Sequence, residues 1–145
     1  MSRIEFHTGL ADKPGYACRL LRKAWRAGNR VVVAGDAVQL NRLDALLWTF
    51  EVGEFVPHGR LRAGQPVAPH LARTPIWLAD RPAEAGTCEV LVNLGPELVP
   101  GHEAWPRVIE LVADAPDDAA AGRQRWRAYL AAGAQPVNRS QGAAA

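Results

Sequence analysis

A cationic and aromatic stripe near the end of the chain offers the clearest chemistry in this sequence. Four residues of the segment GRQRWRAYLAAG (122–133) recur at spacings of three and four residues, as on one helical face: Arg123, Trp126, Arg127 and Leu130. Guanidinium groups beside an indole suit a peptide that carries both carboxylates and an apolar anchor. The alternative is that Trp126 and Tyr129 are core anchors and that the arginines are only solvated.

A second candidate surface is the segment LDALLWTFEVGEFVPHG (43–59), the densest group of large apolar side chains in the chain. It surrounds Glu51 and Glu54 with aromatic residues and ends at Pro57-His58-Gly59, where a regular element would stop. Aromatic anchors within a polar rim are typical of protein–protein interfaces. The alternative is a small satellite core beneath a long loop.

Residues suited to catalysis or metal binding are present but scattered. The four histidines, His7, His58, His70 and His102, form no HxH or HExxH pattern and have no cysteine partner. His58 is the best placed of them, but a general base also needs an orienting carboxylate and a nucleophile. The only serines are Ser2 and Ser140, both in expected tails. The sequence therefore predicts no catalytic site and no metal site.

The carboxylates and the phosphate-binding turns add no stronger signal. Asp114, Asp117 and Asp118 cluster before a predicted helix, where capping alone would place them. The turns HTGLADKPGY and AGDAVQ match neither GxGxxG nor GxxxxGK[ST], the patterns that let a backbone approach a pyrophosphate. Gly35-Asp36 is interpreted as a helix cap rather than a nucleotide contact, and no cofactor is expected.

Composition indicates a soluble globular protein of one domain. Apolar residues make up 48% of the 145 residues and charged residues 22%, which argues against disorder. The net charge of +2 is too balanced for the whole protein to bind a polyanion. Cys18 and Cys88 lie far apart, as in a reduced cytoplasmic protein. No segment reaches the roughly 18 apolar residues of a membrane span.

The elements that position these side chains alternate between strands and helices. Short apolar runs predict strands over 3–8, 30–34, 76–78, 89–94 and 107–112, and amphipathic spacing predicts helices over 13–27, 36–47 and 116–132. The Pro- and Gly-rich residues 51–72 are expected to be mostly loop, and residues 138–145 a flexible tail. Because parallel neighbours need helical crossovers, we predict one α/β domain over residues 1–137, with a mainly parallel sheet flanked by helices.

Four stretches together resemble a known family. WRAGNRVVVAGDAVQLNRLDALLWTF, EFVPHG, CEVLVNL and RQRWRAYLAAG, in this order, are similar to the chi subunit of bacterial DNA polymerase III holoenzyme over most of residues 3–133. The resemblance implies a Rossmann-like layer sandwich that has lost nucleotide binding. It also implies a non-catalytic accessory role in the clamp-loader complex during DNA replication.

The resemblance further implies two protein partners. One is the acidic, phenylalanine-terminated C-terminal tail of the single-stranded-DNA-binding protein, whose site maps onto Arg123, Trp126 and Arg127, with Val112 as an apolar wall. The other is the psi subunit, whose site maps onto Phe55 with Trp48, Val56 and Pro57. Two departures bear on the tail site: Ala119 replaces a lysine of some relatives, and Trp126 stands where a tyrosine often occurs.

Two other functions are compatible with the residues alone. A small nucleotide-handling enzyme is suggested by the α/β fold class, and it predicts saturable nucleotide binding. Direct binding of single-stranded nucleic acid by arginine and tryptophan stacking predicts oligonucleotide binding without any peptide. If the resemblance holds, contact with nucleic acid is only indirect and no membrane is involved.

Overall fold

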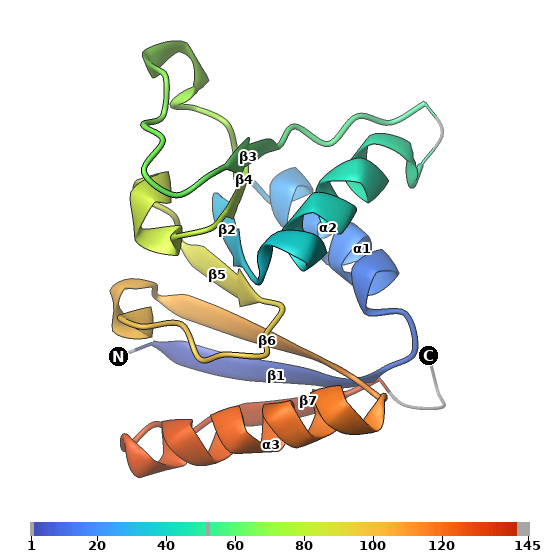
Figure 1. Cartoon of the computed structure of the whole chain (residues 1–145), viewed down its shortest axis with the longest axis vertical. Helices are drawn as coiled ribbons and strands as arrows, with labels where there is room; N and C mark the ends of the chain where they lie inside the picture. Colours follow the sequence, from blue (N-terminus) through green and yellow to red (C-terminus); the bar gives the residue numbers. More distant parts are fainter. Residues whose placement is uncertain (1, 52, 142–145) are drawn as a thin grey trace.

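The computed structural model describes residues 2–51 and 53–141, and these form an α/β layer sandwich (Figure 1). Within them, seven strands make one sheet: β1 (Arg3–Leu10), β2 (Val31–Ala34), β3 (Gly59–Leu61), β4 (Ile76–Ala79), β5 (Val90–Asn93), β6 (Arg107–Ala113) and β7 (Val137–Ser140). The strand order is β3-β4-β2-β5-β6-β1-β7, and every pairing is parallel. The helices are α1 (Lys13–Arg26), α2 (Ala37–Thr49) and α3 (Pro116–Ala131). The predicted fold class is confirmed.

The central strands are apolar because both faces of the sheet are covered. All residues of β2, β4 and β5 are buried, as expected of parallel strands that are covered on both faces. Helices α1 and α2 pack on one face, and α3 covers β1 and β6 on the other (Figure 1). The sheet therefore holds each helix in a fixed position over its strands.

Strand β1 divides its side chains between the two faces. Phe6 points into the core beneath α3, whereas Glu5 and His7 point to the face that carries α1. This alternation follows from the two-residue period of a strand. One strand thereby contributes to a separate surface on each side of the sheet.

The helix starts follow the local sequence. Asp36 caps α2 by accepting a hydrogen bond from the Gln39 backbone N–H, and the Gln39 side chain in turn accepts one from the Asp36 backbone. The predicted cap at Gly35-Asp36 is thus confirmed. Asp12 caps α1 in the same manner through the Gly15 N–H.

Two strands lie where the sequence predicts none. Strand β3 (Gly59–Leu61) falls in the segment expected to be loop, and β7 (Val137–Ser140) overlaps the start of the tail expected from residue 138. Both are short edge strands without an apolar run, so their pairing with β4 and β1 leaves little trace in the sequence. Residues 142–145 of that tail lie outside the described residues. Strand β1 also extends two residues beyond the predicted end at residue 8, with a register irregularity between His7 and Leu10.

Both cysteines are free and buried. Burial raises the pKa of the Cys18 thiol to about 11, so this thiol stays protonated near neutral pH. Among the helices that the structure describes, none is long and apolar enough to cross a bilayer.

Candidate partner-binding site

A pocket of about 430 Å³ lies between α3 and the strand pair β1 and β6, and we call it the α3 pocket. Its lining comes from elements that are distant in sequence: Phe6, Thr8, Gly9, Val112, Ala113, Asp114, Ala119, Gly122, Arg123, Trp126 and Asn138. Three of the four residues predicted for peptide binding, Val112, Arg123 and Trp126, meet here. The fourth, Arg127, does not line the pocket.

Helix α3 is fixed over the sheet by a buried polar cluster. Glu110 on β6 is fully buried and accepts hydrogen bonds from Arg125 Nε at 2.7 Å and Tyr129 Oη at 2.6 Å. Asn93 on β5 donates a third at 2.9 Å. Burial raises the pKa of the Glu110 carboxyl, and the Arg125 charge and these hydrogen bonds oppose that rise. Anchored by Arg125 and Tyr129, the helix presents its neighbouring stripe, which carries Arg123 and Trp126, at the pocket.

The floor of the pocket depends on a close approach of α3 to β6. Gly122 faces Val112, and a Cβ on this glycine would lie only 2.7 Å from Val112 Cγ1. Trp126 packs edge-on against Phe6, with ring centroids 5.1 Å apart. The indole is therefore partly buried and held by the core, while it still borders the pocket.

The two arginines of the stripe differ from Arg125 in their surroundings. Arg123 and Arg127 are exposed, and neither donates a hydrogen bond or forms an ion pair with another described residue. Arg125, by contrast, is 2% exposed. Arg123 lies at the pocket beside Trp126, although Asp114 adds a negative charge to the same lining. The arrangement suits a ligand with one carboxylate at Arg123 and an apolar group over Trp126 and Val112.

A separate aromatic surface lies at the end of α2, formed by Trp48, Phe55 and Pro57. Trp48 is 57% exposed and Phe55 is 52% exposed, with their ring centroids 5.1 Å apart. Pro57 is partly exposed beside them. Two large exposed rings in contact are unusual on a protein surface and are typical of an interface anchor.

Val56 corrects the predicted set of interface residues. It is 0% exposed and belongs to the core beneath α1 and α2, so its side chain does not reach a partner at this surface. Alternation along an extended segment explains the difference, because Phe55 points outward where Val56 points inward. Val56 anchors the segment and does not recognise a partner.

His58 supports the aromatic surface from below. Its ring centroid lies 4.9 Å from that of Trp48, its Nε2 is 3.0 Å from Asp44 Oδ1, and its Nδ1 is 2.8 Å from the Val56 carbonyl oxygen. Both ring nitrogens thus contact protein oxygens. These contacts fix the His58 ring against Trp48.

Three of the carboxylates that the sequence singles out, Glu51, Glu54 and Asp118, are paired with cations. Glu51 and Glu54 form ion pairs with Arg22, and Glu54 also pairs with Arg26. Asp118 pairs with Lys13 at 2.9 Å and accepts a hydrogen bond from the Ala113 N–H. Over the described part of the chain, no group of three or more His, Cys, Asp or Glu is arranged to hold a metal ion.

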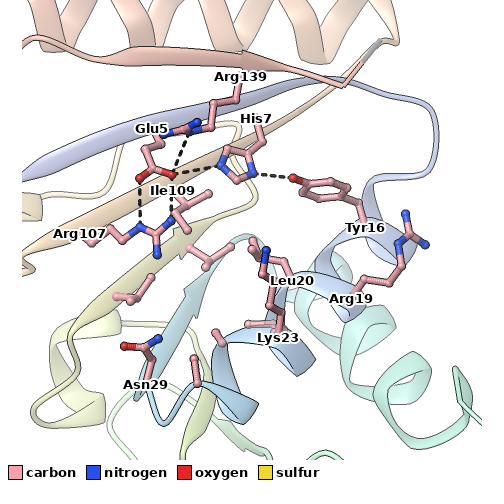
Figure 2. A pocket seen from close by; sticks show the side chains of 15 residues that line it. Glu5, His7, Tyr16, Arg19, Leu20, Lys23, Asn29, Arg107, Ile109 and Arg139 are labelled. Carbon is pink, nitrogen blue, oxygen red and sulfur yellow. Dashed lines mark hydrogen bonds and ion pairs between the residues drawn. The ribbon is translucent and has the colours of Figure 1, made fainter. Parts of the chain in front are cut away.

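Sequence reasoning missed a polar cluster under α1. Glu5, His7 and Tyr16 form a hydrogen-bonded chain, with 3.3 Å between Glu5 Oε2 and His7 Nε2 and 2.6 Å between His7 Nδ1 and Tyr16 Oη (Figure 2). The signal was the two-residue spacing of Glu5 and His7, which places both on one face of a strand. The contact with Tyr16 on α1 leaves no such pattern.

Comparison with known proteins identifies relatives along nearly the whole chain. The family model described as "DNA polymerase III chi subunit, HolC" matches residues 1–137. DNA polymerase III subunit chi of Pseudomonas aeruginosa is 32% identical over 137 residues, which cover 89% of each chain. The chi subunit of Escherichia coli is 29% identical over 130 residues, 86% of this chain and 83% of the relative. That of Haemophilus influenzae is 30% identical over 115 residues, 77% of this chain and 74% of the relative.

Proposed function

The chain belongs to the chi subunit family of DNA polymerase III, and from this premise we propose that it is a non-catalytic adaptor of the clamp-loader complex. Its partner at the α3 pocket is the acidic C-terminal tail of the single-stranded-DNA-binding protein. The observation that carries this proposal is the meeting of unpaired Arg123 with Trp126 and Val112 in one pocket. The adaptor links this tail to the polymerase complex during DNA replication.

Each chemical feature of such a tail has a counterpart in or beside the α3 pocket. The Arg123 guanidinium binds the terminal carboxylate, and Trp126, Phe6 and Val112 enclose the terminal phenylalanine ring. Arg127 lies one helical turn further along α3, outside the pocket, and binds carboxylates that precede the terminus. A peptide with a buried ring and flanking charges thus uses both predicted arginines.

Affinity at this pocket is expected to be modest and to fall with salt. Arg123 and Arg127 are solvated, so their pairing with carboxylates is screened over about 8 Å at physiological ionic strength. Asp114 in the lining and Ala119 in place of a lysine both lower the local positive charge. The apolar ring contact then supplies much of the binding free energy, offset by ordering of the peptide.

The aromatic surface is the proposed site for a clamp-loader partner, a psi subunit where one is present. Trp48 and Phe55 offer two adjacent rings, and the paired charges of Arg22, Arg26, Glu51 and Glu54 lie nearby. An apolar centre beside polar residues is the usual anatomy of a stable interface.

Phe55→Ser is expected to abolish co-purification with clamp-loader subunits while leaving the unfolding temperature nearly unchanged, because Phe55 is half exposed. Retention of these subunits by Phe55→Ser and by Trp48→Ser would remove this assignment.

The tail proposal is tested by fluorescence anisotropy with a labelled acidic peptide that ends in phenylalanine. We expect Arg123→Ala to weaken binding at least tenfold and Arg127→Ala to weaken it several-fold. Arg73→Ala is the matched control, because Arg73 is exposed before β4, towards the opposite end of the sheet. Unchanged affinity in both α3 variants would refute the proposal. A labelled oligonucleotide in the same assay is expected to show no comparable binding.

A further inference from the structure

A second pocket, which we call the α1 pocket, lies on the opposite face of β1 and β7 from the α3 pocket. It has a volume of about 480 Å³, within the range of small-molecule sites. Glu5, His7 and Arg139 line it, whereas Phe6, Thr8 and Asn138 from the same two strands line the α3 pocket. The two pockets therefore share strands but no lining residue.

The α1 pocket combines an apolar floor with a cationic rim. Its floor is formed by side chains of α1, β5 and β6: Leu20, Leu21, Ala24, Val90, Val92 and Ile109. Four cations, Arg19, Lys23, Arg107 and Arg139, line it against the single carboxylate of Glu5. Burial would raise the pKa of Glu5, but hydrogen bonds from Arg107 and His7 outweigh it and lower that pKa to about 2. The lining therefore carries excess positive charge at neutral pH.

The hydrogen bonds between Arg107 and Glu5 leave one nitrogen of the Arg107 guanidinium group free. Arg107 donates from Nε and Nη2 to the two oxygens of Glu5, at 3.2 and 3.0 Å. Its remaining nitrogen points away from Glu5 (Figure 2) and has no partner among the described residues. Lys23 on α1, likewise without an ion pair in the described part, lines the same space. Two free donors thus border an apolar floor.

The Glu5–His7–Tyr16 chain is saturated and does not provide a catalytic base. The ionised Glu5 accepts from His7 Nε2–H, so His7 Nδ1 accepts from the Tyr16 hydroxyl. Burial lowers the pKa of His7 and raises that of Tyr16, which keeps both groups neutral near pH 7. The chain fixes the wall of the pocket without offering a proton acceptor. The α1 pocket is therefore suited to binding and not to proton transfer.

The position of the α1 pocket in the sheet argues against a nucleotide as its ligand. Val90 and Arg107 are the first residues of β5 and β6, so the pocket lies at the amino ends of these strands. Nucleotides in open α/β sheets bind at the carboxyl ends. Lys23, Ala24 and Ala27 belong to the C-terminal end of α1, whose dipole disfavours a polyphosphate. A ligand with a single negative charge is the better match.

We propose that the α1 pocket binds a small carboxylic acid with a compact apolar body. The carboxylate lies between the free nitrogen of Arg107 and the Lys23 ammonium, and the apolar body rests on Ala24, Val92 and Ile109. This site is independent of the α3 pocket and of the proposed tail binding.

Calorimetric titration with phenylacetate and with its neutral analogue phenylacetamide tests the proposal. We expect saturable binding of phenylacetate and at least a tenfold weaker binding of phenylacetamide. Lys23→Gln is expected to weaken phenylacetate binding about fivefold, and Arg107→Gln more strongly. Because Arg107 also supports Glu5, Ala27→Phe serves as a second variant: Ala27 is exposed at the pocket mouth, and the added ring blocks entry.

The controls separate this proposal from the tail proposal. Arg123→Gln is expected to bind the tail peptide more weakly and phenylacetate as the unmodified chain does. Lys23→Gln is expected to bind phenylacetate about fivefold more weakly and the tail peptide as the unmodified chain does. Equal binding of phenylacetate and phenylacetamide, or unchanged phenylacetate binding in Lys23→Gln and Ala27→Phe, would overturn the α1 site. Tighter binding of AMP or inorganic phosphate than of phenylacetate would overturn the ligand class.

Discussion

At the scale of single residues, three arginines of this protein have three different roles. Arg125 is buried in the Glu110 cluster, Arg107 is shared between Glu5 and the α1 pocket, and Arg123 is free at the α3 pocket. The difference lies in desolvation, because a guanidinium removed from water needs an anionic partner, whereas a solvated one does not. The solvated Arg123 can therefore offer its whole guanidinium group to an external carboxylate, whereas Arg107 can offer only the nitrogen that Glu5 does not use.

The Glu5 carboxylate makes the free energy of unfolding fall at acid pH. Its folded pKa of about 2 lies below the ordinary value of 4.5. The stabilisation is therefore complete above about 4.5 and is lost as the pH falls towards 2. Glu5→Gln is expected to lower the free energy of unfolding at pH 7 by about 2 kcal/mol, since one pKa unit corresponds to about 1.4 kcal/mol and solvent screens part of the effect.

Urea unfolding between pH 7 and pH 2.5 measures this effect. The curve of stability against pH is expected to be flatter for Glu5→Gln than for the unmodified chain below about pH 4.5. Glu103→Gln is the control, because the Glu103 side chain is 74% exposed. An identical acid transition in Glu5→Gln would show that the arginines around Glu5 do not stabilise its ionised form.

At the scale of elements, helix α3 determines the α3 pocket through two contacts with β6. One is the close approach of Gly122 to Val112, and the other is the polar cluster around Glu110. Both lie on the buried side of the helix, and both orient the exposed stripe. Changes to Glu110, Arg125 or Tyr129 should therefore alter a pocket that these three residues do not line.

Gly122→Ala is expected to destabilise the protein although alanine is the better helix former. In an unhindered helix this change stabilises by about 1 kcal/mol. Here the new methyl group would meet Val112 Cγ1 at 2.7 Å, and the overpacking is expected to cost about 1–3 kcal/mol. Thermal unfolding measures the change in stability of Gly122→Ala, with Ala120→Gly as a control for helix propensity alone. A Gly122→Ala variant that is more stable than the unmodified chain would contradict the close approach of α3 to β6.

Arg125→Ala is expected to lower the free energy of unfolding by about 3–5 kcal/mol, because it leaves Glu110 buried without its cation. Arg127→Ala, on the exposed side of α3, is expected to change it by less than about 0.5 kcal/mol. Urea unfolding of both variants provides the comparison. Equal effects of the two substitutions would mean that the buried pair does not hold α3.

The sequence predicts elements well where apolar residues carry the pattern. VVVA at 31–34 and VLVN at 90–93 are strands because both faces are covered, and the predicted helices differ from the observed ones by at most two residues at either end. Strands β3 and β7 were missed because their only signature is a pairing partner elsewhere in the chain. Likewise, Phe6 and Gly122 join the pocket through tertiary packing, which no local spacing reveals.

At the scale of the whole molecule, the two proposed partner sites are well separated. Helix α3 and strands β1 and β7 lie at one end of the sheet, and β3 lies at the other (Figure 1). The α3 pocket belongs to the first end, and the aromatic surface follows α2 in the segment that leads to β3. They share no residue and rest on different helices, so simultaneous binding at the two proposed sites is expected. An adaptor requires this geometry, in which binding at one site does not block the other.

The most direct test of tail binding at the α3 pocket is an NMR titration of the ¹⁵N-labelled chain with the phenylalanine-ended acidic peptide and with the same peptide amidated at its C-terminus. We expect shifts at the Trp126 indole N–H and at the backbone N–H groups of Phe6 and Arg123. We expect none at Trp48 or Phe55, and much weaker binding of the amidated peptide. Shifts confined to other surfaces, or equal affinity for the two peptides, would contradict the claim that the α3 pocket receives a partner's carboxyl terminus.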